Sequence, residues 1–288
     1  MTVAYASVAS ATKAHGGGTD SLTINKPASL AVGDTMFAAL HIHGSSAGFS
    51  LAGWSTLLTG NDGSNQGLRV LWKIADSADV AASNFAFSTA GTSGDGMSGF
   101  IVRVTGTITD IDNILFTHDV NASATTTHTF TPGLTPVLAN TLLLIGSGVR
   151  GDTTQSGYAV TNNNPSWTER VDTSINTSND SSISLATATL SAIGDTGDFN
   201  ITLGGSFEAV GFLIAITENV SVSGNHAILN MTSDLLGGTI TVGTTASHAI
   251  LAMSSEIFST SALIERNGRW VDEEMNTKTW EDEVNGGY

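Results

Sequence analysis

Short runs of apolar or alternating apolar and polar residues, separated by Gly, Asn, Asp and Ser, fill the chain up to residue 217. A period of two residues is typical of strands, and no stretch before residue 220 has the 3.6-residue period of an amphipathic helix. The pattern predicts two successive series of strands: 3–8, 21–24, 35–43, 54–58, 68–74, 84–88 and 99–105, then 127–131, 141–149, 167–171, 182–189, 198–203 and 209–217. Such spacing predicts an all-β protein with an antiparallel, jelly-roll-like β-sandwich.

The two series resemble each other. "KPASLAVGDTMFAALHI" resembles "TPGLTPVLANTLLLIGS", and "AGWSTLL" resembles "PSWTERV". Trp54 then aligns with Trp167 at an offset of 113 residues, and Phe100 aligns with Phe212 at an offset of 112. Nearly constant offsets indicate an internal duplication, with halves of about 1–108 and 109–219. We expect the two Trp side chains to be largely buried at equivalent points of the two halves.

The segment between the two series bears on whether the halves share one core. It contains Ile111, Ile114, Leu115 and Phe116, which favour burial, and it is not rich in Pro, Gly or Ser. This favours one duplicated sandwich over 1–219, and two tandem small sandwiches remain the alternative.

A second repeat begins near residue 220. "HAILNMTSDL" starts at His226 and "HAILAMSSEI" starts at His248, which is a period of 22 residues. We expect residues 220–261 to form two short β repeats. Two repeats bury little by themselves, so they would lie against the sandwich or against a neighbouring subunit.

Residues 262–288, the C-terminal arm, contain seven acidic and three basic residues. In an extended chain Trp270 and Trp280 would lie on the same face, about 33 Å apart, whereas a helix would rotate them apart by about 80°. We expect an extended acidic arm that contacts a neighbouring subunit or another protein of the same assembly through Trp270, Val271, Trp280 and Val284, because Trp is enriched among interface anchors.

Composition excludes several classes of protein. The formal net charge is −16, and no Lys or Arg occurs between Arg170 and Arg266, so we expect no nucleic-acid binding. The absence of Cys excludes disulfides, thiolate zinc sites and cysteine nucleophiles. We find neither a signal peptide nor an apolar run of about 18 residues, so we expect synthesis in a cytoplasm without membrane insertion.

Two stretches could carry catalysis or bind a metal. "GSSAG" fits G-x-S-x-G with Ser46 as the nucleophile, but a strand-like stretch follows where the nucleophile elbow requires a helix. His41 and His43 share one face of a strand, and a third metal ligand would have to come from His118, His128 or a distant carboxylate. We expect instead a strand end with one or both His rings solvated.

Oxygen-rich stretches at 60–67 ("GNDGSNQG") and 110–113 ("DIDN") could supply calcium ligands, but turn formation by Asn, Asp and Gly explains both. No spacing of carboxylates indicates the acid pair of a glycosidase. We therefore predict no catalytic residue, no metal site and no cofactor.

"SLTINKPASLAVGDTMFAAL", "GWSTLL", "LRVLWKIAD" and "SGFIVRVTG", in this order, resemble a β-sandwich module of tail-associated and other virion proteins of tailed bacteriophages. "PSWTERV" and "VGFLIAITE" are similar to the continuation of that module. The repeat of period 22 and "RWVDEEMNTKTW" resemble the ends of marine and cyanobacterial podophage structural proteins, although those commonly carry Pro and Gln between the Trp residues. The resemblance implies a structural role in the virion and no chemistry.

We therefore expect a non-enzymatic virion protein, a tail-appendage or head-decoration subunit that is made in the host cytoplasm. Its partners would be copies of itself and other virion proteins. The alternative is a carbohydrate-binding adhesin of the virion, with Trp54 or Trp167 exposed to stack on a host-surface glycan. A glycan depolymerase or an esterase is a third hypothesis, for which the sequence contains no convergent acid or Ser/His site.

Overall fold

The computed structural model describes residues 3–44, 47–106, 114–136 and 138–217, and the backbone of four short strands between residues 228 and 273. The chain divides into two compact units, Met1–Asn219 and Val220–Tyr288. Strands dominate the described residues, and no helix among these has the length and apolarity needed to cross a membrane. The prediction of an all-β protein with antiparallel sheets is confirmed.

The first half of the first unit, residues 3–106, contains a five-stranded sheet in the order β1-β7-β3-β5-β4. Its strands are β1 (Ala4–Ala14), β3 (Thr35–His43), β4 (Ser55–Asp62), β5 (Gln66–Ile74) and β7 (Gly96–Thr105). A separate two-stranded sheet pairs β2 (Gly18–Asn25) with β6 (Asn84–Gly91). The short helix α1 (Ser77–Ala81) precedes β6, and Asp76 caps it by accepting hydrogen bonds from the amides of Ala78 and Asp79.

The second half, residues 114–217, contains a six-stranded sheet. Its strands are β8 (Ile114–Phe130), β9 (Thr141–Val149), β10 (Gln155–Val160), β11 (Thr168–Ile175), β12 (Ser181–Leu190) and β13 (Phe199–Ile216). Residues 209–216 of β13 lie between β8 and β9, and β12 and β11 follow. The order β8-β13-β9-β12-β11 therefore matches the order β1-β7-β3-β5-β4 of the first half. The strands β13, β9, β12 and β11 take the places of the strands that the sequence repeat aligns with them. The remaining strand, β8, takes the place of β1.

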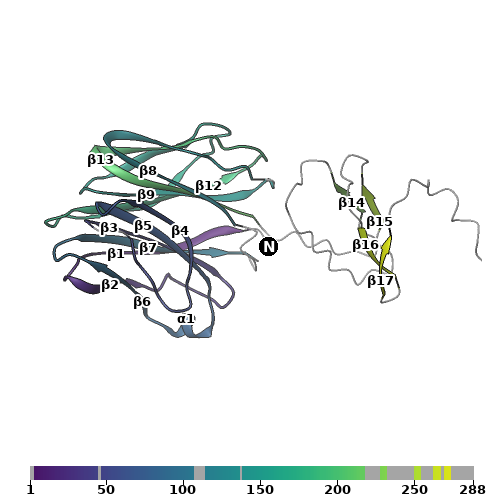
Figure 1. Cartoon of the computed structure of the whole chain (residues 1–288), viewed down its shortest axis with the longest axis horizontal. Helices are drawn as coiled ribbons and strands as arrows, with labels where there is room; N and C mark the ends of the chain where they lie inside the picture. The colour runs from purple at the N-terminus through teal and green to yellow at the C-terminus, as the bar shows by residue number, and fades with distance from the viewer. Residues whose placement is uncertain are drawn as a thin grey trace, which may run out of the picture. The chain divides into compact units, whose positions relative to one another are not determined.

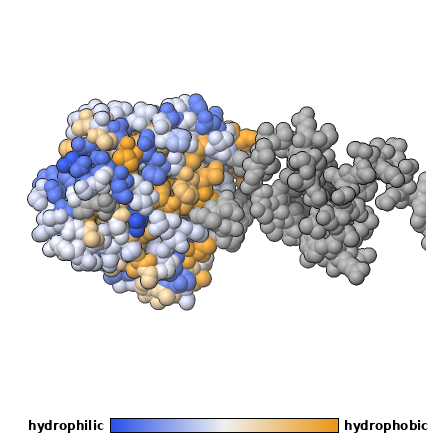
Figure 2. Space-filling model, viewed as in Figure 1, coloured by the Kyte–Doolittle hydropathy of each residue, from blue (hydrophilic) through white to orange (hydrophobic). Residues whose placement is uncertain are grey.

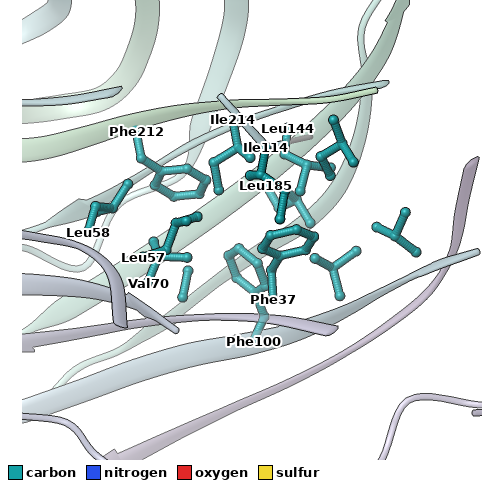
Figure 3. Packing of buried hydrophobic residues seen from close by; sticks show 14 of the residues in the cluster. Phe37, Leu57, Leu58, Val70, Phe100, Ile114, Leu144, Leu185, Phe212 and Ile214 are labelled. Carbon is teal, nitrogen blue, oxygen red and sulfur yellow. The ribbon is translucent and has the colours of Figure 1, made fainter. Parts of the chain in front are cut away.

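The large sheets of the two halves pack against each other, face to face (Figure 1). Between them lies a shared core, to which both halves contribute large buried side chains. Figure 3 shows Phe37, Leu58 and Phe100 of the first half opposite Phe212 and Ile214 of the second. A single hydrophobic layer thus joins the halves.

Each half also has a core of its own. One lies between the first five-stranded sheet and the β2–β6 pair, and another lies within the second half. The alternation of side chains along β3 and β9 explains how one strand serves two cores. Phe37 and Ala39 of β3 and Leu142 and Leu144 of β9 face the shared core, whereas Ala38, Leu40, Leu143 and Ile145 face the separate cores.

A β-bulge recurs at aligned positions in the two halves. The register between β4 and β5 shifts between Thr56 and Leu58, and the register between β11 and β12 shifts between Glu169 and Val171. Each shift lies two to four residues after Trp54 or Trp167. A bulge bends its strand and is usually retained among related folds. Bulges at aligned positions are therefore expected if one segment was duplicated.

The apolar segment between the two series begins β8, and its side chains have different environments. Ile114 is buried in the shared core and Leu115 packs against the core of the second half. Phe116 is 41% exposed, so the expectation that it is buried is wrong. Ile111 lies outside the described residues. On the face drawn in Figure 2, hydrophilic and intermediate residues cover most of the coloured surface, and hydrophobic residues gather over one part of it.

In the second unit the repeats of period 22 pair with each other. β14 (Ile228–Met231) and β15 (Ile250–Met253) are parallel, and Ile228 pairs with Ile250 at an offset equal to the repeat. β16 (Ala262–Arg266) and β17 (Arg269–Glu273) are antiparallel. The first part of the predicted arm is therefore a β-hairpin, and residues 274–288 lie outside the described residues.

Candidate functional site

The layer between the two large sheets becomes polar at one end, where His41 of β3 is completely buried. The Nδ1 atom of His41 lies 2.8 Å from Oγ of Ser181, and Nε2 lies 3.1 Å from Oε1 of Gln66. The Oγ of Ser181 is also 2.7 Å from Oγ of Ser98. Since Ser181 belongs to β12 and the other three residues to the first half, this network joins the halves.

The hydrogen bonds define the protonation of His41. With the amide of Gln66 oriented as it is here, its oxygen accepts a hydrogen bond from Nε2–H, and Nδ1 accepts a hydrogen bond from the Ser181 hydroxyl. Burial lowers the pKa of His41 to about 3, because the charged imidazolium would lose its hydration, and the hydrogen bond to Gln66 only partly offsets this. The ring is therefore neutral at physiological pH.

A Ser hydroxyl bonded to a His ring is the pair from which acyl-transfer enzymes build their nucleophile, so the chemistry of Ser181 needs consideration. Here Ser181, His41, Ser98 and Gln66 are all 0% exposed, so no substrate reaches the hydroxyl. The third group is a neutral amide, which cannot stabilise an imidazolium as a carboxylate does. We conclude that this network holds the two sheets together.

His43 is half-buried beside this network and has different partners. Its Nδ1 bonds to the Asp180 carbonyl oxygen at 2.7 Å, and Arg150 donates a hydrogen bond from Nε to His43 Nε2 at 2.7 Å. Burial lowers the pKa of His43, and the nearby Arg150 charge lowers it further. The expectation of a solvated His at this strand end is wrong for His41, which the second half covers.

The residues weighed as metal ligands do not converge. His128 is buried and bonds through Nε2 to the Phe207 carbonyl oxygen at 2.9 Å. Among residues 3–217, apart from the undescribed gaps, no three His, Asp or Glu side chains gather in a way that could hold a metal ion. Residues 60–67 form the end of β4, the turn at 63–65 and the start of β5, with the Asn65 amide donating to the Asp62 carbonyl oxygen at 2.9 Å. Ser46 and the stretch at 110–113 lie outside the described residues.

The aligned aromatic residues occupy comparable places. Trp54 is partly buried and packs edge-on against Phe85 and Phe87, at ring distances of 5.6 and 5.2 Å. Trp167 is also partly buried against the core of its half, and its Nε1 donates to Asn164 Oδ1 at 2.9 Å. Both rings are thus only partly covered by their own halves, so the expectation that they are largely buried is met only in part. Phe100 and Phe212 are both buried in the shared core.

Of the four residues assigned to the arm, Trp270 and Val271 lie in β17, where they pair with Glu265 and Ile264. Trp280 and Val284 lie outside the described residues.

A groove of about 770 Å³ lies where β1 and β11, the edge strands of the two large sheets, come together. Its lining includes Tyr5 of β1, Arg170 of β11 and Thr187 of β12. Arg170 places its guanidinium carbon 4.0 Å from the centre of the Tyr5 ring. Sequence reasoning missed this groove because Tyr5 and Arg170 are remote in the chain. The one available signal was that Arg170 is the last basic residue before a long stretch that has none.

Comparison with known proteins adds no relative: no family model matches the chain, and no curated protein or solved structure is significantly similar to it.

Proposed function

We propose that this protein is a non-enzymatic structural subunit of a bacteriophage virion, a homo-oligomeric tail appendage or head decoration. Its support is the resemblance of segments such as "SLTINKPASLAVGDTMFAAL" and "PSWTERV" to β-sandwich modules of tailed-phage virion proteins. The antiparallel all-β architecture agrees with that resemblance.

The observation that carries the assembly part of the proposal is the pairing of the C-terminal repeats. β14 and β15 pair in parallel, with each residue of one repeat beside the same position of the next. A two-stranded sheet is only marginally stable by itself, and each of these strands has an edge that no other described strand pairs. Such edges recruit further strands, and a second copy of the chain brings strands of the same pattern.

The non-enzymatic part rests on the closed Ser181–His41 pair. The one Ser–His pair with nucleophile-like geometry among the described residues is fully buried between two sheets. An esterase would need its Ser–His pair in an open site, whereas Ser181 and His41 are both completely buried.

Deletion of residues 220–288, which removes the paired repeats together with the C-terminal arm, tests this proposal. We expect the truncated protein to keep the fold of residues 3–217, because the shared core lies entirely within them. We also expect it to lose its oligomeric state in analytical ultracentrifugation and its incorporation into particles. Normal incorporation and an unchanged oligomer would overturn the assembly role, whereas a monomeric, folded and unincorporated protein would support it.

The second candidate function is carbohydrate binding. Trp54 and Trp167 do not favour it, because both pack against their own halves. The groove between β1 and β11 does favour it, since hydroxyl and amide side chains line it.

A further inference from the structure

Arg170 differs from the other arginines of residues 3–217 in the hydrogen bonds that its guanidinium makes. Arg69 and Arg103 each donate from Nη1 to a backbone carbonyl oxygen, and Arg150 pairs through Nη1 with Glu208. Arg170 donates only from Nε, to Thr187 Oγ1 at 2.8 Å. Its two terminal nitrogens, Nη1 and Nη2, have no hydrogen-bond partner among the described residues.

The position of this guanidinium is nevertheless held. The Thr187 bond anchors it at one side, and it lies over the Tyr5 ring at 4.0 Å, a cation–π distance. A guanidinium that is already fixed loses little conformational freedom when a ligand binds. The two terminal nitrogens, Nη1 and Nη2, are therefore suited to bidentate binding of a carboxylate.

The rest of the groove is lined by both polar and apolar residues, and none of the described ones is acidic. Besides Arg170, its lining includes the hydroxyls of Ser166, Thr168 and Thr187 and the amide of Asn164, and no Asp or Glu among the described residues contributes to it. In a chain with 26 acidic and 10 basic residues, a groove with one cation and no carboxylate favours an anionic ligand.

The side-chain amide of Asn164 can also donate hydrogen bonds to a ligand. Its Oδ1 accepts hydrogen bonds from Trp167 Nε1 at 2.9 Å and from the Val160 amide at 3.0 Å. Its Nδ2 group has no partner among the described residues and remains a donor. Neighbouring hydroxyls both donate and accept, which matches the mixed requirements of sugar hydroxyls.

The fold does not require an arginine here. The sequence offset that aligns Trp54 with Trp167 places Leu57 at the position of Arg170, and both lie within the recurring bulge. Leu57 is buried in the shared core, whereas Arg170 lines an open groove. The second half therefore has a polar, cationic residue where the first half has an apolar one.

From these observations we infer that the groove between β1 and β11 binds a sugar residue that carries a carboxylate, such as a uronic acid. Nη1 and Nη2 of Arg170 bind the carboxylate, and Asn164, Ser166 and Thr168 bind ring hydroxyls. The volume of about 770 Å³ is within the range of small-ligand sites and accommodates a short oligosaccharide. This inference does not depend on the virion assignment, so either can fail without the other.

The test is isothermal titration of the full chain with trigalacturonate, with its methyl ester and with the neutral galactose trimer. We expect trigalacturonate to bind, and the two uncharged trimers to bind at least about 10-fold more weakly, which is the loss that charge-assisted hydrogen bonds predict. Raised salt should weaken the binding of trigalacturonate, because the ion pair between Arg170 and the carboxylate would be open to solvent.

Three variants separate the site from general charge effects. Arg170→Ala should weaken trigalacturonate binding about 10- to 100-fold, and Arg170→Lys should recover only part of the loss because a single ammonium lacks the fork. Lys13→Ala is the control, because it removes one positive charge from an exposed ion pair with Asp20 outside the groove. Thermal unfolding should confirm that each variant folds.

Equal binding of the acidic and neutral trimers, or of Arg170→Ala and the unaltered chain, would overturn the inference. An oligoglutamate peptide that binds more tightly than trigalacturonate would also overturn it, because the groove would then select an acidic peptide. No detectable binding of any of these probes would overturn it as well.

Discussion

The phenyl rings of Phe100 and Phe212 lie 6.4 Å apart, tilted by 42°, and each comes from a different half of the first unit (Figure 3). These are the two residues that the sequence repeat aligns with each other. A residue that contacts its own equivalent is the arrangement expected across a two-fold axis. At this point the two halves therefore meet through residues that the sequence repeat aligns.

Removal of either ring should destabilise the whole unit. Phe100→Ala and Phe212→Ala should each lower the free energy of unfolding by about 3–5 kcal/mol, because both rings are buried in the shared core. A double-mutant cycle should give a coupling of about 0.5–1.5 kcal/mol, as for other aromatic pairs. Phe116→Ala, at a ring that is 41% exposed, is the control and should change stability by about 0.5 kcal/mol or less. Additive effects would show that the rings do not interact.

A methyl group at Gly148 should force the two large sheets apart. A Cβ atom there would lie 2.4 Å from Cδ2 and 2.6 Å from Cγ of His41, closer than real Cβ atoms approach. Gly148→Ala should therefore cost about 1–3 kcal/mol in chemical denaturation. Gly48→Ala is the matched control, because its nearest neighbour, Thr89 Oγ1, would be at an ordinary 3.5 Å. A neutral Gly148→Ala would contradict the close packing of β9 against β3.

His41 should make stability fall as the pH falls. Its pKa is about 3 in the folded protein and about 6.5 in the unfolded chain, so between these values only the unfolded chain binds the proton. The free energy of unfolding should thus decrease by about 1.4 kcal/mol per pH unit for this group as the pH drops below 6.5. His43 and His128, whose pKa values are also lowered, act in the same direction.

Nitrogen chemical shifts of the imidazole rings would test this directly. The His41 ring should remain neutral at pH 5, and His41→Gln should show a shallower loss of stability between pH 6.5 and pH 5. A His41 midpoint near 6.5 would mean that the ring is accessible to water and that the network between the sheets is open.

The register of the C-terminal repeats can be tested by cross-linking. In a parallel pair, Cα atoms of paired residues are about 5 Å apart, which a disulfide can span. Asn230 pairs with Ala252, so Asn230→Cys with Ala252→Cys should cross-link on oxidation, in a chain that has no cysteine of its own. Asn230→Cys with Met253→Cys is offset by one residue and should cross-link poorly. The opposite ranking would contradict the repeat-to-repeat register.

The central strands of the fold were predictable from the sequence. β3 and β9 begin and end where the apolar runs at 35–43 and 141–149 do, because a strand buried on both faces is a continuous apolar run. The edge strand β10 was not predicted, because "QSGYAV" has few large apolar residues. For β8 the sequence predicted only residues 127–131, since "NASATTT" has small polar residues that pair with β13 through the backbone.

The sequence also contains two local signals, one for the start of α1 and one for the turn between β16 and β17. Asp76 and Asp79 form a capping box at α1, with Asp in the place where Glu or Gln is usual. Asn267 and Gly268 separate β16 from β17, and Asn-Gly is the strongest short signal for a hairpin. The buried network and the groove were not predictable in the same way, because His41 meets Ser181, and Tyr5 meets Arg170, only when the two halves pack together.

The central claim, that this chain is a structural part of a virion, is tested most directly by quantitative mass spectrometry of purified phage particles. We predict that the full chain is present in a fixed number of copies per particle, a number set by the symmetry of the tail or the head. A chain that is abundant in infected cells and absent from purified particles would contradict it.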